Sequence, residues 1–379
     1  MKWITAKLTD ISNPKQWKNL PISEMSENGF LVYGANGIIG KYKEYNHEFP
    51  TLAITCRGAT CGTLNITEPK SYITSNAMAL DDVSKDVDQK FLYYALKKRG
   101  FKDIITGAAQ PQITREGLNK IVLNIPEKLS DQLHIANILS KAENLIAQRK
   151  ASIALLDEFL TSSFLKMFGD PVRNEKGFEK SALKNFSRIR IGPFGSLLHR
   201  EDYVQHGVPL VNPSHISDGK IVIDDELTIS KEKMKELSAY VMQEGDVVLG
   251  RRGEIGRCAV VTENENGFLC GTGSIFIRPT NKLQPIYLYN VISSSSMRKV
   301  LENSAKGITM KNLNSGIVEE LKIPAPPIEL QNKFAELVMK TESQKEKYKN
   351  SLTELENLYG SLSQSAFKGE LEFKTNISD

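Results

Sequence analysis

The chain has 379 residues, of which 40% are hydrophobic and 25% charged, which is typical of a soluble protein with more than one core. Its net charge of +4 excludes a histone-like polycation but allows basic patches on one face. The first ten residues lack the apolar core of a signal peptide, and no apolar run approaches the ~18–20 residues of a membrane span. We therefore expect a cytoplasmic protein without a membrane partner.

A first sheet-containing domain is expected over residues 1–128, where short β-branched and aromatic runs alternate with glycine and asparagine. Residues 30–33 and 51–55 are predicted strands, and residues 89–98 a helix. The glycine-rich stretch at 34–42 has one residue too many for a phosphate-binding loop, and Tyr42 stands where that loop needs Ser or Thr. We therefore reject nucleotide binding at this stretch.

Two long helices are expected, one over residues 129–168 and one over residues 328–369, because apolar residues recur at alternating four- and three-residue spacings. Gly169 and Pro171 end the first helix. Residues 169–327 return to the strand-and-turn pattern of a second domain, and residues 370–379 form a tail. The order is therefore domain, helix, domain, helix.

The second helix repeats the first at an offset of 199 positions. Its predicted seam is apolar except at Thr341 and Lys345, and the positions 199 residues earlier are apolar except at Arg149 and Ser163. Each helix would extend about 55 Å, and helices of this length usually pair. The alternative is two unrelated amphipathic helices over separate cores, but the preceding segments also correspond. We predict an α+β protein with two tandem sheet-containing domains and two antiparallel helices in a coiled coil with pseudo-two-fold symmetry.

The motifs of several enzymes are missing from the sequence. The turn at 271–273 lacks the third glycine of a methyl-donor loop, and residues 212–214 lack the rest of an amino-methyltransferase motif. Glu320 and Lys322 have no nearby preceding aspartate for a nuclease site. The histidines form no catalytic pattern, and the four cysteines form no CxxC pair, so we expect packed, reduced thiols. We expect a non-catalytic chain without a metal site.

Binding chemistry remains, in the form of arginines beside glycine turns in both domains. Arg57 precedes one such turn, and Arg251 and Arg252 precede the other. A guanidinium there can form two parallel bonds to a phosphate or a guanine edge. A surface charge or structural salt bridge is the commoner role of one arginine, but the repetition favours DNA binding. The candidate DNA-binding residues are Lys41, Arg57, Gln110, Gln112, Thr114, Arg190, Ser196, His199, Arg200, Arg251, Arg252, Lys306, Lys311 and Asn312.

On these residues the chain resembles the DNA-sequence specificity subunit of type I restriction-modification enzymes over nearly its whole length. The most specific pieces are residues 34–40 followed by 57–60, residues 192–196 followed by 207–209, and the helix ends at 168–171 and 365–371. The resemblance implies that the two domains are target-recognition domains, each reading one half of an asymmetric, bipartite site in double-stranded DNA. The two helices would then be spacers.

The resemblance also implies partners. Two methyltransferase subunits would bind S-adenosylmethionine, and restriction/translocase subunits would use ATP and Mg, so that this subunit holds no cofactor itself. Leu145, Phe159, Leu337 and Leu358 lie off the helix seam, and we expect them to be exposed and to bind the methylating partners. Contact with the base of a recognition domain is the alternative role.

Two other functions stay open: a bifunctional restriction enzyme/methyltransferase fragment, and a structural scaffold that does not read DNA. One departure from the repeat is visible, because the first domain is shorter and has no obvious counterpart of the loop at 192–198. If the helices set the distance between half-sites, their length predicts an unread gap of about 6–8 base pairs.

Overall fold

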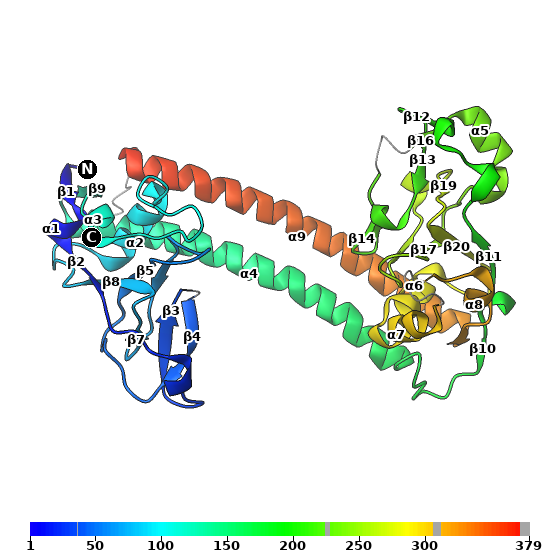
Figure 1. Ribbon diagram of the computed structural model, residues 1–379, viewed down its shortest axis with the longest axis horizontal. Helices are drawn as coiled ribbons and strands as arrows, with labels where there is room; N and C mark the ends of the chain where they lie inside the picture. The colour runs from blue at the N-terminus through cyan, green and yellow to red at the C-terminus, as the bar shows by residue number, and fades with distance from the viewer. Residues whose placement is uncertain (36, 224–227, 306–311, 372–379) are drawn as a thin grey trace, which may run out of the picture. The chain divides into compact units, whose positions relative to one another are not determined.

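The structure is a computed structural model that describes residues 1–35, 37–223, 228–305 and 312–371 (Figure 1). It divides into two compact units, Met1–Ala151 with Asn350–Asp379, and Ser152–Lys349, here called unit 1 and unit 2. Each unit combines a globular part with half of each long helix, α4 (Leu129–Phe168) and α9 (Ile328–Lys368). Both helices were expected over nearly these residues. Because the units cut across the helices, the domain boundaries given above stay a prediction.

Unit 1 is built on a four-stranded antiparallel sheet, with a smaller sheet in which two strands run parallel. The large sheet has the order β2 (Asn13–Gln16), β8 (Ala77–Asp81), β5 (Leu52–Thr55) and β6 (Leu64–Ile66). The small sheet has the order β4 (Gly37–Tyr42), β3 (Phe30–Gly34) and β7 (Tyr72–Ile73), with β3 and β7 parallel. A separate ribbon and three short helices complete the unit: β1 (Trp3–Lys7) with β9 (Val122–Pro126), and α1 (Leu8–Ile11), α2 (Gln89–Arg99) and α3 (Arg115–Leu118).

The large sheet of unit 2 repeats the strand order of the large sheet of unit 1, and the second sheet of unit 2 has one strand more. Its large antiparallel sheet consists of β11 (Ser187–Ile191), β20 (Ser274–Pro279), β17 (Val247–Gly250) and β18 (Cys258–Val260). Its second sheet consists of β12 (Tyr203–Val204), β16 (Thr228–Ile229), β13 (Val208–Val211) and β19 (Leu269–Cys270), the last two parallel. The remaining elements are β10 (Lys180–Ala182) with β21 (Lys322–Pro324), β14 (Ile216–Ser217) with β15 (Lys220–Ile221), and α5 (Lys231–Glu236), α6 (Pro285–Ser293), α7 (Ser295–Ser304) and α8 (Ser315–Glu319). The two domains therefore share one α+β fold, as expected.

A buried glutamine near the start of each long helix makes equivalent hydrogen bonds in the two units. In unit 1 the Gln132 amide donates to the carbonyls of Asp86 and Pro126 at 2.9 Å each and accepts from the Asp88 N–H at 2.8 Å. In unit 2 the Gln331 amide donates to the carbonyls of Lys282 and Pro326 and accepts from the Gln284 N–H at 2.9 Å. Asp88 and Gln284 cap α2 and α6. Each glutamine thus joins a long helix to a short one.

The long helices pack antiparallel within each unit. In unit 1, Ile135 and Leu139 of α4 share a core with Ala366 of α9. In unit 2, Phe164 of α4 packs on Phe334 of α9, with ring centroids 5.4 Å apart. The seam positions expected from the heptad pattern are buried or half-buried along both helices.

The polar interruptions of the seam are accommodated by specific bonds. Lys345 pairs with Asp157 across the two helices, and the Thr341 hydroxyl donates to the Leu337 carbonyl at 2.8 Å. In unit 1, Glu143 of α4 accepts from the Tyr359 hydroxyl of α9 at 3.1 Å, and burial raises the pKa of that phenol to about 12.

Nowhere in the described ranges is a helix long and apolar enough to cross a bilayer.

Candidate nucleic-acid interface

The two arginine–glycine turns occupy equivalent places in the two sheets. Each follows a central strand, β5 in unit 1 and β17 in unit 2, and puts an exposed arginine before a glycine with positive φ. The pairs are Arg57 with Gly58 (φ 88°) and Arg252 with Gly253 (φ 72°). A Cβ at these angles would be strained, so the backbone requires glycine and can approach a ligand closely. The repetition seen in the sequence is therefore a repetition in space.

Three other segments meet the turn in unit 1. The Cys56 N–H donates to the Asn76 carbonyl, and the Gly58 N–H donates to the Pro111 carbonyl, both at 3.0 Å. The Thr60 hydroxyl donates to the Ala35 carbonyl at 2.5 Å, which ties in the end of the β3–β4 hairpin. These bonds gather the turn, the hairpin and the loop at 106–112 at one edge of the sheet.

Neighbouring segments also gather at the turn in unit 2. The Arg251 N–H donates to the Gly273 carbonyl at 3.0 Å, and the Gly273 N–H donates to the Asn212 amide oxygen at 3.3 Å. The loop after β11 joins them, because the Thr272 hydroxyl donates to the Pro193 carbonyl at 2.8 Å. We call these gathered loops the reading edge of each unit.

The approach of the loop after β11 to this edge depends on one glycine. A Cβ on Gly192 would lie 2.0 Å from the Gly271 carbonyl oxygen, a distance that no side chain tolerates. Both residues are buried, and the Gly192 N–H donates to the Ser274 carbonyl at 3.1 Å. The sequence motif that begins at Gly192 is therefore a packing requirement at the base of the loop.

The predicted DNA-binding residues of unit 1 fall into three groups. Arg57 and Gln112 form an isolated bridge and, with Gln110, are exposed at the reading edge. Thr114 caps α3, because its hydroxyl oxygen accepts from the Gly117 N–H at 3.1 Å. Lys41 is exposed on β4, about 13 Å along the strand from the hairpin turn. The structure thus brings together three of these five residues.

In unit 2, Arg252, His199 and Arg200 are exposed. Arg190 is exposed too, but its guanidinium donates to the Ala239 carbonyl at 2.9 Å. The side chain of Ser196 and the residues Lys306 and Lys311 lie outside the described part of the chain.

Arg251 and Asn312 differ from the surface groups that the sequence suggested. Arg251 is 7% exposed, and its Nε donates to the Asn312 amide oxygen at 2.9 Å and to the Leu313 carbonyl at 3.2 Å. Burial, and the neighbouring Arg252 charge after it, lower the pKa of this guanidinium. In the unit 1 turn the residue equivalent to Arg251 is Cys56, which is buried and makes the same backbone hydrogen bonds. Arg251 therefore supports the turn from inside, and Arg252 is its exposed arginine.

The first domain does have a counterpart of the loop at 192–198, contrary to the sequence expectation. Gln16 and Ile191 occupy the same place in their sheets. Gln16 of β2 pairs with Met78 of β8, and Ile191 of β11 pairs with Ile275 of β20. β8 in turn pairs with the central strand β5, and β20 with the central strand β17. The segment at 17–20 therefore corresponds to the loop after β11. The two loops share no sequence, and only the strand register shows their equivalence.

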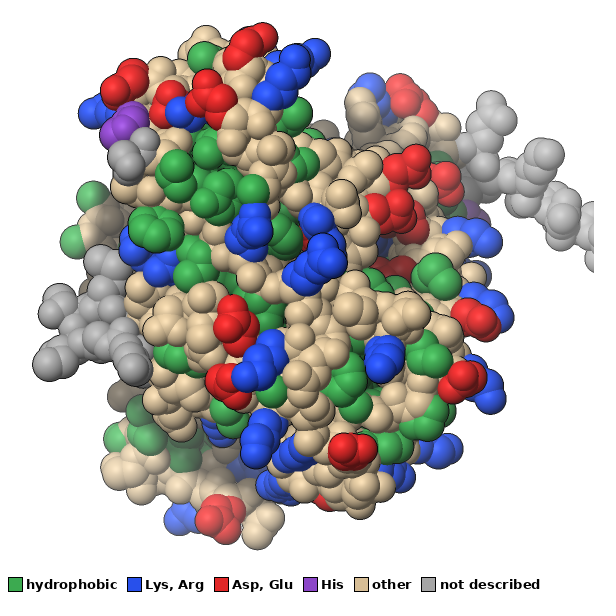
Figure 2. All heavy atoms as spheres, turned by 90° about the vertical axis from the view of Figure 1, so that its right-hand side faces the viewer, with side chains coloured by type: hydrophobic (Ala, Val, Ile, Leu, Met, Phe, Trp, Pro, Cys, Tyr) green, Lys and Arg blue, Asp and Glu red, His purple; other side chains and the backbone are tan. Residues whose placement is uncertain are grey.

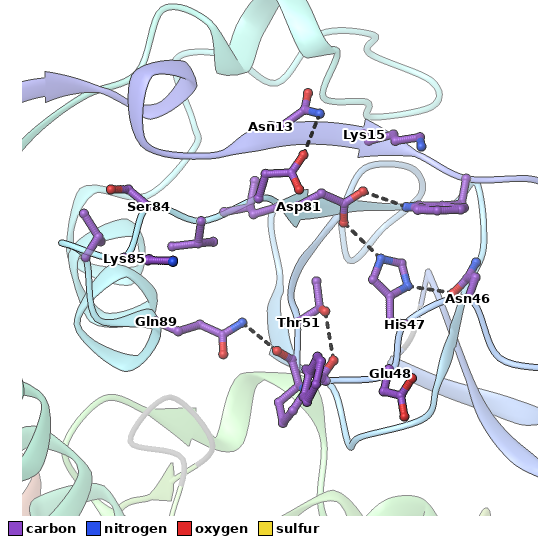
Figure 3. A pocket seen from close by; sticks show the side chains of 17 residues that line it. Asn13, Lys15, Asn46, His47, Glu48, Thr51, Asp81, Ser84, Lys85 and Gln89 are labelled. Carbon is purple, nitrogen blue, oxygen red and sulfur yellow. Dashed lines mark hydrogen bonds and ion pairs between the residues drawn. The ribbon is translucent and has the colours of Figure 1, made fainter.

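A cavity of about 760 Å³ in unit 1 lies beside this segment (Figure 3). In it, Asp81 accepts from the Trp17 indole at 3.1 Å and from His47 Nε2 at 3.0 Å, while His47 Nδ1 bonds the Asn46 amide oxygen at 2.6 Å. Both ring nitrogens of His47 are engaged, and Asp81 holds the Trp17 indole at the start of the loop.

Charges of both signs cover the face shown in Figure 2, where Lys and Arg side chains are interspersed with Asp and Glu. This pattern fits the mild net charge of +4. A nucleic-acid contact on this face would therefore depend on a few placed groups rather than on a broad basic field.

The apolar residues expected on the outer helix faces separate into two groups. Leu145, Phe159 and Leu358 are exposed, as expected. Leu337 is half-buried and packs against the core of unit 2, which is the alternative role considered for these residues. The other exposed large apolar residues on the described parts of these helices, which the heptad pattern did not lead us to expect, are Leu129, Leu133, Leu155, Leu165 and Met339.

Cys56, Cys258 and Cys270 are buried thiols, and Cys61 is half-buried. Burial raises the pKa of Cys258 to about 12. Among the residues that the structure describes, no cluster of three or more His, Cys, Asp or Glu side chains could hold a metal ion.

Comparison with known proteins gives one consistent family. A family model described as the type I restriction modification DNA specificity domain matches residues 1–155 and 175–357. The type I restriction enzyme MjaVIII specificity subunit of Methanocaldococcus jannaschii is 23% identical over 70% of this chain and 66% of its own length. The EcoBI specificity subunit of Escherichia coli is 26% identical over 45% of this chain and 37% of its own length. The matched part thus spans less than two thirds of these relatives.

Solved structures share the fold. The S subunit of a type I restriction-modification system from M. genitalium matches with a TM-score of 0.65 and 17% identity, covering 97% of this chain and 96% of that one. A chain from a study of complex assembly and conformational transition of the type I system matches with a TM-score of 0.56 and 15% identity, covering 97% and 98%.

Proposed function

Because the chain belongs to the family of type I restriction-modification DNA specificity proteins, we propose that it reads an asymmetric, bipartite DNA site with the reading edges of its two units. The observation that carries the proposal is the equivalent place of Arg57 and Arg252, each exposed at a glycine turn where three other loops meet. A guanidinium in this setting suits bidentate contact with a phosphate or a guanine edge. Exposed amides beside Arg57, those of Gln110 and Gln112, add groups that pair with adenine.

The reading edges of the two units carry different side chains, although both lie at the ends of equivalent strands. Cys56 in one turn stands where the other has Arg251, and the loops that flank the turns differ in length and sequence. Two domains with one fold and different reading side chains would prefer different half-sites. The site is therefore asymmetric in this proposal.

Catalysis belongs to partners in this proposal. Methylating subunits would dock on the exposed apolar residues of α4 and α9, namely Leu145, Phe159 and Leu358. They would bring S-adenosylmethionine, and restriction/translocase subunits would bring ATP and Mg. This chain would recognise the DNA sequence and provide the surfaces to which the partner subunits bind.

Selection from a library of random duplexes tests DNA reading directly. The full-length protein, alone and with any subunit that co-purifies, is incubated with the library, and the bound DNA is sequenced. We expect two short fixed sequences separated by a gap of fixed length, and binding that weakens linearly in log affinity with log salt. Enrichment of no sequence, with binding of partners intact, would favour the scaffold function instead.

A further inference from the structure

Phe194 is a large apolar side chain that is exposed to solvent at the end of a loop whose first residues are buried. It is 60% exposed at the tip of the loop after β11. The two residues before it, Gly192 and Pro193, are buried and bonded to the neighbouring loop at 271–274. The ring is therefore not on a loose tail, and its position relative to the reading edge of unit 2 is set by the backbone.

The neighbours of this ring belong to the reading edge. The segment at 271–273 that binds the base of the Phe194 loop also accepts the Arg251 N–H, one residue before the exposed Arg252. Single exposed apolar residues are common on protein surfaces. This one differs because the base of its loop and the arginine turn are bonded to the same segment, so that DNA bound at the turn would lie near the ring.

The equivalent position in unit 1 is Asn19. Gln16 and Ile191 match by sheet register, and Asn19 and Phe194 are the third residues after them. Asn19 is exposed, and its amide oxygen accepts from the Ser75 hydroxyl at 3.4 Å, while Thr272, the counterpart of Ser75, bonds the Phe194 loop. The third position after the equivalent strand ends thus carries an amide in one unit and an aromatic ring in the other.

These two side chains suit different base pairs. In the major groove an asparagine can bond adenine at N6 and N7, whereas a phenylalanine can only make apolar contact, for which the thymine C5-methyl group is the partner. We propose that Phe194 contacts a thymine methyl group in the half-site bound by unit 2, and that this position gives the two domains different sequence preferences. The inference rests on the proposed DNA-reading function and names one specificity-determining contact within it.

The test is a methyl scan of the selected DNA. Each thymine of the two half-sites is replaced in turn by uracil, which removes only the C5-methyl group, and binding of the full-length protein is measured. At one thymine of one half-site we expect about fourfold weaker binding, the factor for exposing one buried methyl group. The Phe194→Ala protein should bind the thymine and uracil forms equally, and Phe194→Leu should keep part of the difference.

The control variants fix the location of the contact. Phe49 is 76% exposed in unit 1 but lies before β5, at the end of that strand opposite the reading edge, so Phe49→Ala should keep the full methyl effect. Asn19→Ala should weaken preference only in the other half-site. Thermal unfolding of each variant shows whether it folds.

Three results overturn the inference in distinguishable ways. If the unaltered protein selects a bipartite site but no uracil weakens its binding, Phe194 does not contact a thymine methyl group, whatever the variants do. If Phe194→Ala is folded and keeps the methyl effect, another side chain makes the contact. If the unaltered protein selects no sequence at all, the DNA-reading function fails together with this inference.

Discussion

Arg57 and Arg252 are the residues on which we expect DNA affinity to depend most directly. Each is exposed at an equivalent turn, so Arg57→Ala and Arg252→Ala should each weaken binding. A lost base-edge contact would cost roughly 1–3 kcal/mol and relax specificity in one half-site. A lost phosphate contact would instead weaken binding to all sequences and flatten the salt dependence by about one unit. Salt titrations of binding to specific and random duplexes separate the two roles.

Arg173 provides a control for charge alone, since it is exposed and pairs with Glu175 at 3.8 Å in the segment after α4. Arg173→Ala should leave affinity and salt dependence unchanged. Equal small losses in all three variants would mean that Arg57 and Arg252 act only through net charge.

Arg251 should behave differently from its neighbour, because its guanidinium is buried against Asn312 and Leu313. Arg251→Ala leaves a buried carbonyl and a half-buried amide oxygen without their donor, and we expect a loss of about 2 kcal/mol or more in the free energy of unfolding. Arg252→Ala should change that free energy by less than about 0.5 kcal/mol. Urea unfolding of the two variants measures the difference, and similar stabilities would contradict the structural role.

The contrast between Arg251 and Arg252 also shows where sequence reasoning stops. The arginine–glycine pattern located both turns, but a sequence does not distinguish Arg251 from Arg252. Arg251 is the buried one because Asn312, which is distant in sequence, packs against it and accepts its Nε–H. Asn19 and Phe194 make the same point more strongly. Their equivalence is visible only in the register of the strands before them, because the loops have no identical residues at equivalent positions.

At the scale of elements, Gln132 and Gln331 should be strong stability determinants. Each is buried, and each makes three bonds that join the start of a long helix to the cap of a short one. Replacing either by leucine leaves one buried carbonyl, one part-buried carbonyl and one part-buried N–H without their partner, so we expect a loss of about 2 kcal/mol or more. Gln364→Leu, at an exposed site of α9, is the control. Differential scanning calorimetry should show lower melting temperatures for the two buried sites only.

The outer faces of the long helices carry the prediction about partners. Phe159 and Leu358 are exposed, so Phe159→Glu and Leu358→Glu should leave the melting temperature unchanged. If methylating subunits dock there, a carboxylate buried in the interface would be left unpaired and the complex should dissociate. Leu337→Glu is the opposite case, because Leu337 packs on the core and its replacement should lower stability. Co-purification from cells that express all subunits gives the answer, and complexes of normal composition would exclude these faces as the docking sites.

The long helices were predictable from sequence, whereas much of the sheet was not, for a physical reason. A heptad pattern sustained over 40 residues leaves few alternatives, and its polar interruptions are satisfied by local pairs such as Lys345 with Asp157. Strands such as β7 and β19 have two residues each and carry no periodicity. They exist because a parallel neighbour, β3 or β13, pairs with them.

For the molecule as a whole, the antiparallel helix pair supplies the clearest hypothesis about target spacing. Both units use halves of the same two continuous helices, and cross-helix pairs such as Lys150 with Glu356 and Asp157 with Lys345 fix their register. If this pair sets the distance between the half-sites, helix length and DNA gap must change together. The half-site sequences should not change, because each depends on the reading edge of one unit.

Inserting four residues after Ala151 and four after Ser351 tests this, because matched insertions preserve the pairs on both sides. Each insertion lengthens its helix by about 6 Å and turns it by about 400°, which returns the seam to within about 40° of its original face. At the duplex rise of ~3.4 Å we expect the gap to grow by one or two base pairs while both half-sites stay the same. Three-residue insertions rotate the seam by about 60° the other way and should lower the melting temperature instead. Sequencing of selected duplexes measures the gap, and a stable four-residue variant that still selects the original spacing would show that the helices do not set it.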